Sequence, residues 1–170
     1  SADETFYRIL IPQKNKKGKG VKKGYIWVFI GMRSKMVYLL YDNGARTEEV
    51  ILNELKSYKG IVQSDGYAPY RKLERADYPD IIRIPCIQHI KRKFIDCGEN
   101  DPDAKEIVGL FNNLYHQEHK HKIGIGGWTE EHQLDYRRKY APDILGELSD
   151  KLYEIENRGD LLPKSELQAA

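Results

Sequence analysis

Two aspartates lie at the ends of strand-like runs, where their carboxylates could act on a phosphate group. Asp3 opens a strand-like run near the N-terminus, and Asp65 closes another run directly before a glycine. Two-metal phosphoryl transfer requires acidic oxygens from separate chain segments that converge on a pair of hard cations. Aspartate suits this task because Mg²⁺ prefers compact oxygen coordination, completed by waters and phosphate oxygens. The residue types therefore permit a metal-dependent phosphoryl-transfer site.

A structural role is the alternative for each aspartate. Strands avoid aspartate and glycine, so the Asp65-Gly66 pair after Ile61 and Val62 is either an ordinary turn or a carboxylate mounted at a strand end. Local signals do not choose between these interpretations. The choice depends on whether the fold brings Asp3 and Asp65 together.

Three strand-like runs open the chain. Residues 4–11, 24–31 and 36–42 are rich in β-branched and aromatic side chains, and Asn43-Gly44 closes the last of them. A long loop rich in lysine and glycine makes the first connection. We expect these runs to form an antiparallel meander.

A helix and two further strands follow. The segment 45–60 has Thr47 as a candidate N-cap, and Gly60 ends it. Its apolar stripe consists of Val50, Ile51, Leu55 and Tyr58. Residues 61–65 and 80–87 are predicted strands, joined through a short helix at 68–76.

The strand at 61–65 follows a strand and a helix, so we expect it to lie parallel to an earlier strand through a right-handed crossover. If that neighbour is the first strand, Asp3 and Asp65 come close together. From Gln88 onward helical spacing dominates, over 89–97, 103–122 and 129–159. We predict an α/β fold with a mixed sheet of three antiparallel strands and then parallel strands, flanked by helices, with a helical C-terminal segment.

The composition is that of a globular domain. Of 170 residues, 40% are hydrophobic and 32% are charged. No apolar stretch approaches the ~18 residues that cross a bilayer, and the first residues given do not have the basic-then-apolar layout of a signal peptide. Cys86 and Cys97 are too few for a disulfide framework. We therefore expect a cytoplasmic protein without a membrane partner.

The net charge of +2 is unevenly distributed. No acidic residue lies between Thr5 and Tyr41, and lysines crowd residues 14–23, whereas the chain from Asp143 onward is rich in acids. This separation favours a polyanion partner, with nucleic acid the leading candidate. A solvated lysine-rich loop is the alternative explanation.

Four short stretches together resemble the catalytic core of the insertion-sequence-66 family of bacterial transposases. They are "ADET" at 2–5, "GYIWVFIG" at 24–31, "IVQSDGYAPYRKL" at 61–73 and "CIQHIKRKF" at 86–94. Their order and spacing agree over roughly residues 2–97, and the helical remainder with "LPKSELQAA" is similar to the segment that follows in the family.

The resemblance implies a ribonuclease H-like fold and DNA transposition, in which a triad of acids cleaves and joins strands at transposon ends. By position, Asp3 and Asp65 would be the first two triad carboxylates and would bind Mg²⁺ or Mn²⁺ in a two-metal site. Residues 1–97 would be an incomplete catalytic core, and 98–170 a helical insertion or the start of the core's C-terminal part. The implied partners are DNA of the transposon ends and the target, other transposition proteins of the element, and further copies of the chain.

The third acidic residue of the family lies on a later helix, in an asparagine-rich stretch that ends in glutamate and arginine. Nothing after Gly159 matches that stretch. We therefore expect the chain to stop before the triad is complete, and the isolated chain to be inactive.

The segment after the last predicted strand carries further candidates. Cys86 and His89 have the spacing of half a zinc site, but a second pair of ligands is not evident. The resemblance instead implies that Cys86 lies in the core and His89 near the active site. Lys91, Arg92 and Lys93 follow and could bind DNA phosphates, with a solvent-facing helical turn as the alternative.

Aromatic residues have both structural and binding interpretations. Tyr67 and Tyr70, beside Asp65, could touch a DNA strand or stack on the edge of the core. We expect Trp128 to be a packing anchor for the helical part. The histidines of 116–121 do not share one helix face, which favours a solvated polar end over a metal site.

Three hypotheses for the function follow from the sequence. The leading one is a transposase catalytic core that cleaves and joins DNA. The second is a DNA-binding or assembly module without catalytic activity, and the third is a ribonuclease H-like nuclease that cuts without joining ends.

Overall fold

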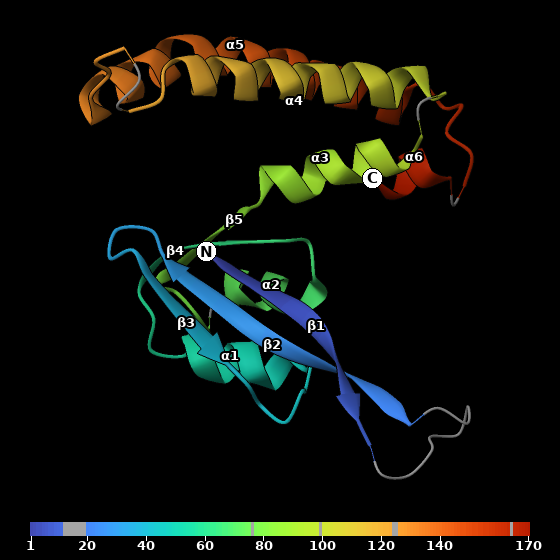
Figure 1. The fold of residues 1–170 in the computed structure, drawn as a ribbon. Coiled ribbons are helices and arrows are strands. Elements are labelled where there is room, and N and C mark those ends of the chain that lie inside the picture. Colours follow the sequence, from blue (N-terminus) through green and yellow to red (C-terminus); the bar gives the residue numbers. More distant parts are fainter. Residues whose placement is uncertain (12–19, 76, 99, 124–125, 164) are drawn as a thin grey trace. The chain divides into compact units, whose positions relative to one another are not determined.

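The computed structural model describes residues 1–11, 20–75, 77–98, 100–123, 126–163 and 165–170. The chain divides into two compact units, Ser1–Ile87 and Gln88–Ala170, and each is considered by itself (Figure 1). Most of the lysine-rich loop, including residues 14–19 of the predicted polyanion-binding run, falls outside the described residues.

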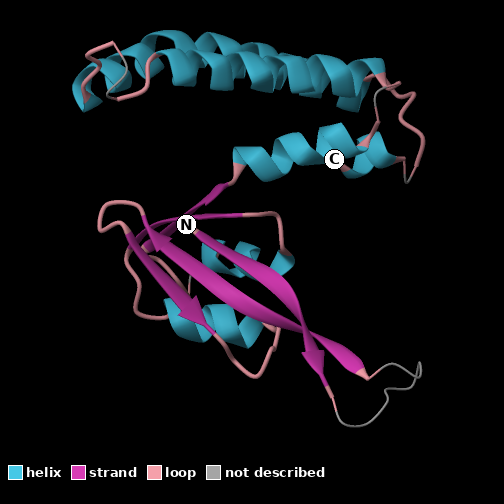
Figure 2. Ribbon diagram, viewed as in Figure 1, coloured by secondary structure: helices cyan, strands magenta, loops and turns pink. Residues whose placement is uncertain are grey.

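The first unit contains the predicted antiparallel meander. Strands β1 (Ala2–Leu10), β2 (Val21–Gly31) and β3 (Met36–Leu40) form a sheet in the order β1-β2-β3, and both pairs are antiparallel (Figure 2). The β2–β3 turn includes Lys35 with φ of 57°. Runs of β-branched and aromatic residues therefore predicted these strands correctly, although β1 and β2 begin before the predicted runs.

A second, two-stranded sheet pairs β4 (Gly60–Ser64) in parallel with β5 (Ile81–Pro85). The prediction that β4 pairs in parallel with an earlier strand is wrong: among the described residues, the strand that β4 pairs with is β5, which follows it in the sequence. The reason is that β4, the helical segment after it and β5 are themselves a strand–helix–strand unit, which satisfies the same crossover rule. Strands β1 and β4 nevertheless lie in contact with each other.

Short helices connect and cover these strands. Helix α1 (Glu48–Leu55) precedes β4, while α2 (Ala68–Arg71) and the 3₁₀ helix η1 (Lys72–Glu74) lie between β4 and β5. Thr47 is the N-cap residue of α1, as expected, but its side chain makes no capping hydrogen bond. The helix ends at Leu55, before the predicted stop at Gly60.

One hydrophobic core joins both sheets and α1. Its buried members include Ala2 on β1, Trp27 on β2, Ile51 on α1 and Val62 on β4. Trp27 is fully buried and donates a hydrogen bond from Nε1 to the Ala45 carbonyl oxygen, at 3.1 Å. Because Ala2 and Val62 belong to this one core, β1 and β4 are held beside each other by packing rather than by ladder bonds.

The second unit is helical, as predicted. Its helices are α3 (Ile87–Asp96, whose first residue is the last of the first unit), α4 (Pro102–Lys120), α5 (Glu130–Asn157) and α6 (Glu166–Ala169). The side chains of Asp101 and Thr129 cap α4 and α5 by accepting backbone N–H bonds. In the part of the chain that the structure covers, no helix combines the length and apolarity needed to span a membrane.

Helices α4 and α5 lie side by side as a hairpin (Figure 1). Near one end, Asp103 of α4 accepts hydrogen bonds from Arg158, the shorter at 2.7 Å, and pairs with Lys151 at 3.3 Å. Near the other end, Glu118 of α4 accepts a hydrogen bond from Nε of Arg137 on α5, at 2.7 Å. Ion pairs at both ends therefore fix the register of the hairpin.

Candidate functional site

Strand β1 carries two consecutive acids that point to different surroundings. Side chains alternate between the faces of a strand, and here Asp3 is exposed whereas the side chain of Glu4 is only 3% exposed. Asp3 accepts a hydrogen bond from the Glu4 backbone N–H to Oδ1, at 2.8 Å. The strand therefore presents one carboxylate outward and buries the next.

Asp65 follows β4 directly, as the sequence predicted, and it is half-buried. Its Oδ1 accepts a hydrogen bond from the Tyr67 backbone N–H, at 2.9 Å. Arg83 of β5 donates to the Asp65 carbonyl oxygen at 3.2 Å and to Ser64 Oγ at 3.3 Å. The carboxylate thus closes a turn at the strand end, and this turn is anchored to the neighbouring strand.

Glu4 is the buried partner of Arg46. Nε of Arg46 donates to Glu4 Oε1 at 2.7 Å, Nη2 donates to the same oxygen, and the Tyr70 hydroxyl donates to Oε2 at 3.4 Å. The guanidinium also lies over the Tyr67 and Tyr25 rings, 4.0 Å and 5.1 Å from their centroids. Arg46 is therefore held in one orientation while about a third of its side chain (36%) stays exposed.

The electrostatics connect the acids of β1 with the acid after β4. Burial raises the pKa of Glu4, the Arg46 guanidinium opposes this, and the charges of Asp65 and Asp3 raise the pKa further. Burial also raises the pKa of Tyr70, and the charges of Glu4, Asp65 and Asp3 add to that shift. Asp3 and Asp65 thus both lie within electrostatic reach of the same buried carboxyl and the same phenol.

The aromatic residues beside Asp65 line the core edge. Tyr70 is fully buried, and its ring meets Trp27 and Tyr67 edge to face, with centroids 6.5 Å and 6.3 Å apart. Tyr67 is half-buried and donates its hydroxyl to the Arg46 carbonyl oxygen at 3.1 Å. Both tyrosines therefore contact and stabilise the part of the core edge that carries Glu4, Arg46 and Asp65.

The donor set can be tested for a divalent metal. No group of three or more histidine, cysteine or acidic side chains is arranged to hold an ion among the residues that the structure describes. Asp3 and Asp65 offer hard carboxylate oxygens, whereas Glu4 is engaged by Arg46. Two carboxylates suit Mg²⁺, which is usually held by one or two together with waters and phosphate oxygens. The residues present fit such an ion in chemical type.

The other predicted site residues lie on α3, in the second unit. His89 is half-buried there, and Arg92 and Lys93 are exposed. Lys91 donates from Nζ to Asn112 Oδ1 at 2.6 Å and lies over the ring of Tyr115. The placement of His89 near the active site, and the binding of DNA by these three cations, stay predictions.

The sequence analysis did not predict that Glu4 and Arg46 form an ion pair beside Asp65, or that the Tyr70 hydroxyl donates to Glu4. The signal for Glu4 was present, because strand alternation puts it on the same face as buried Ala2. Arg46 gave no local signal, since its partner lies 42 residues away.

Comparison with known proteins gives the family. The chain matches the Transposase IS66 family over residues 1–170, and it therefore belongs to this family. It is 28% identical over 123 residues to the uncharacterized protein y4jD of Sinorhizobium fredii (strain NBRC 101917 / NGR234). That match covers 69% of this chain but 23% of the relative, so the chain spans about a quarter of the relative's length. No solved structure matches the chain.

Proposed function

We infer that this chain is part of the catalytic domain of a DNA transposase, with a ribonuclease H-like core that performs metal-dependent phosphoryl transfer at transposon ends. Asp3 and Asp65 are the carboxylates that carry the chemistry. Membership of the transposase family supports the class of reaction. The observation that supports the residue assignment is that β1, which carries Asp3, and β4, which Asp65 follows, lie in contact and pack into one hydrophobic core.

Asp3 and Asp65 would hold Mg²⁺ or Mn²⁺. A bound divalent ion supplies Lewis-acid stabilisation of the phosphate and lowers the pKa of an attacking water or hydroxyl. The exposed side chain of Asp3 is open to solvent and DNA, whereas the Asp65 turn, fixed by Arg83, keeps the second carboxylate at a constant position. A two-element arrangement of this kind positions its ligands before the substrate arrives.

Arg46 is the cation of this proposed site. Glu4 and two tyrosine rings orient its guanidinium, so it can meet a phosphate oxygen with little loss of side-chain entropy. The Glu4 charge offsets part of the Arg46 charge, which keeps the surroundings of Asp3 and Asp65 from becoming strongly positive. Tyr70 stays protonated because burial and three nearby acids raise its pKa, so it serves as a hydrogen-bond donor rather than as a base.

DNA is the proposed substrate, in the form of transposon ends and target. Lys91, Arg92 and Lys93 are proposed to add phosphate contacts whose strength falls with salt concentration. Further copies of the chain and other transposition proteins of the element are the proposed protein partners. A third acidic residue would complete the set of metal ligands.

The test is DNA cleavage by the whole protein carrying Asp65→Asn. The exchange removes the charge but keeps the shape, and we expect loss of at least about 100-fold in cleavage rate, as for other groups that act in the transition state. Asp80→Asn is the matched control, because Asp80 is an exposed acid of the same unit whose carboxylate pairs with Lys59 and lies outside the proposed site. Full cleavage by the Asp65→Asn protein would refute the assignment.

Transposon termini labelled on one strand separate transposase from nuclease. Joining of the labelled end to a target molecule supports transposition. Cleavage without joining supports the ribonuclease H-like nuclease, and binding without either reaction supports an assembly module.

A further inference from the structure

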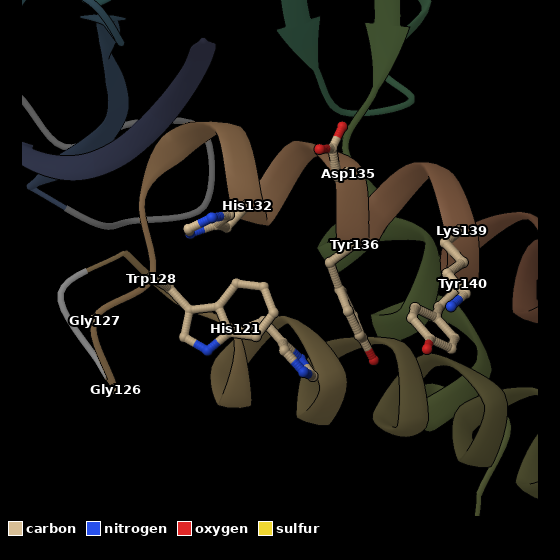
Figure 3. A pocket seen from close by; sticks show the side chains of 9 residues that line it. All are labelled: His121, Gly126, Gly127, Trp128, His132, Asp135, Tyr136, Lys139 and Tyr140. Carbon is tan, nitrogen blue, oxygen red and sulfur yellow. The ribbon is translucent and has the colours of Figure 1, made fainter.

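The tip of the helical hairpin holds an aromatic hollow that the proposed chemistry does not use. It has a volume of about 600 Å³ and lies where α4 ends and α5 begins (Figure 3). Side chains from α5 and from the turn that follows α4 line it, chiefly His121, Trp128, His132, Tyr136, Lys139 and Tyr140. Its size falls within the range of sites that take small organic groups.

The rings in the hollow form an ordered arrangement. His121 stacks on Tyr136 with ring centroids 3.4 Å apart, and Tyr136 stacks on Tyr140 at 4.5 Å. Trp128 stands edge-on to His121, at 4.5 Å with an interplanar angle of 88°. Figure 3 shows the indole beside the His121 ring, with Tyr136 and Tyr140 following along α5. The hollow therefore has stacked rings along one part of its lining and a perpendicular indole at its end.

Hydrogen bonds fix this arrangement. The Tyr136 hydroxyl donates to Gln117 Oε1 at 2.9 Å, and Nδ1 of His121 lies 2.8 Å from the Gln117 carbonyl oxygen. A carbonyl only accepts, so Nδ1 of His121 carries the proton. Gln133 on α5 also bonds to Glu118 on α4, at 3.4 Å. The rings are thus oriented before any ligand arrives, which lowers the entropy cost of binding.

The hollow is more exposed than internal packing requires. Tyr140 is 42% exposed, and His132 and Lys139 are exposed as well. An aromatic cluster that only closed a helical turn would gain stability by burying these surfaces. Exposure of a stacked ring beside the Lys139 cation indicates a binding surface rather than a core.

The charged groups of the hollow match a nucleic acid strand. Nζ of Lys139 lies 5.2 Å from the centroid of Tyr140, and the exposed imidazole of His132 adds a further donor. Among the described residues of the lining, Asp135 is the one acid, and it is exposed. Proteins that bind single strands combine aromatic faces, on which bases stack, with cations that follow the phosphates. A duplex hides its base faces, so only an unpaired base can stack here.

We propose that this hollow binds an unpaired base of a DNA strand, with the base stacked on the exposed ring of Tyr140, the Trp128 indole lining the same hollow, and the adjoining phosphate beside Lys139. The identification of the strand as DNA rests on the proposed function. The recognition is by stacking, so it has little preference for base identity. The chain thereby gains a site for single-stranded DNA that consists of other residues than the acids of the first unit.

Tryptophan fluorescence of the 170-residue chain tests this proposal. The chain has two tryptophans, and Trp27 is fully buried, so Trp128 reports on ligands from solution. The titrant is a short oligothymidylate in buffer with EDTA, compared with an abasic oligomer of equal length. We expect the oligothymidylate to quench Trp128 and to bind at least about fivefold more tightly than the abasic strand, because stacking contributes ~1–3 kcal/mol per base.

Variants assign the binding to the hollow. We expect Tyr140→Ala to weaken oligothymidylate binding roughly 5- to 100-fold, the range for one lost base stack, and Tyr140→Phe to restore it. Tyr153→Ala is the matched control, since Tyr153 lies on the same helix outside the hollow and is 69% exposed. Circular dichroism checks that each variant keeps its helices.

Two results would overturn the proposal: equal affinity for the abasic strand, or no effect of Tyr140→Ala. The assay contains no metal and uses no cleavage readout. Its failure therefore leaves the catalytic role of Asp65 untouched, and loss of cleavage in Asp65→Asn leaves this binding result intact.

Discussion

Replacing Arg46 by methionine should destabilise the first unit in a pH-dependent way. Methionine keeps the packing length of the side chain but removes both hydrogen bonds to Glu4. The Glu4 side chain is 3% exposed, so its carboxylate would keep only the Tyr70 hydroxyl, at 3.4 Å, among its described partners. A buried charge that loses its partner is strongly unfavourable, and the carboxyl escapes this cost by taking up a proton.

Protonation sets an upper limit on the destabilisation. The ordinary pKa of this carboxyl is 4.5, and holding it neutral costs about 1.36 kcal/mol for each pH unit above that value. The limit is therefore about 3.4 kcal/mol at pH 7 and about 0.7 kcal/mol at pH 5. Arg46 is partly exposed and solvent screens its charge, so we expect a loss of about 2–3 kcal/mol at pH 7.

The sign follows from the direction of the pKa shift. Burial raises the folded-state pKa of Glu4 above its unfolded value, and losing Arg46 raises it further. Stability from such a group is fully present below the unfolded pKa and is lost as the pH rises through the folded pKa. The Arg46→Met protein should therefore approach wild-type stability near pH 5 and fall away from it toward pH 7.

Urea unfolding at pH 5, 6 and 7 measures this effect. Fluorescence of Trp27 reports on the unit that contains Arg46, in a Trp128→Phe background that removes the second signal. Adding Glu4→Gln to Arg46→Met should remove the pH dependence, because the amide does not titrate. Arg71→Met, an exposed arginine of the same unit, is the control for loss of a cation. A pH-independent cost of Arg46→Met, or one that survives Glu4→Gln, would refute the account of this ion pair.

Two further predictions concern the helical hairpin and a tight turn. Asp103→Asn should lower the unfolding free energy of the hairpin by about 2 kcal/mol at pH 7, seen by circular dichroism in urea. The hydrogen bond from Arg158 holds the Asp103 pKa below its usual 3.8. The difference in unfolding free energy between wild type and Asp103→Asn should therefore vanish as the pH falls through that lowered pKa. Asp150→Asn, at an exposed acid of the same hairpin, is the control and should have little effect. Gly44→Ala should lower the unfolding free energy by about 1–2 kcal/mol, because Gly44 has φ of +75° and an added Cβ would lie 3.0 Å from a backbone atom. Gly66→Ala is the control and should be close to neutral, since no atom lies near an added Cβ there. Equal effects of the two exchanges would contradict this explanation.

Local chemistry was enough to predict most of the elements. Alternating and β-branched runs located β1, β2 and β3, and helical spacing located α4 and α5. The position of Asp65 after an apolar strand also followed from short-range preferences. These features depend on neighbouring residues, so a single sequence contains the information that they need.

Long-range pairing was the part that local chemistry left open. The crossover rule allows β4 to pair with either an earlier or a later strand, and the structure uses β5. The Glu4–Arg46 pair joins residues 42 positions apart, and only the packing of the core brings them together. The aromatic hollow likewise depends on how α4 and α5 dock, because His121 directly follows α4 and Tyr140 lies on α5.

Binding of Mn²⁺ to the 170-residue chain, followed by electron paramagnetic resonance, tests the central claim most directly. If Asp3 and Asp65 ligate the same ion, Asp3→Asn and Asp65→Asn each remove as much affinity as the double exchange does, since either one opens the shared site. Asp80→Asn should leave the titration unchanged. Mn²⁺ affinity that survives both exchanges, or losses that simply add, would contradict a metal shared between these two aspartates.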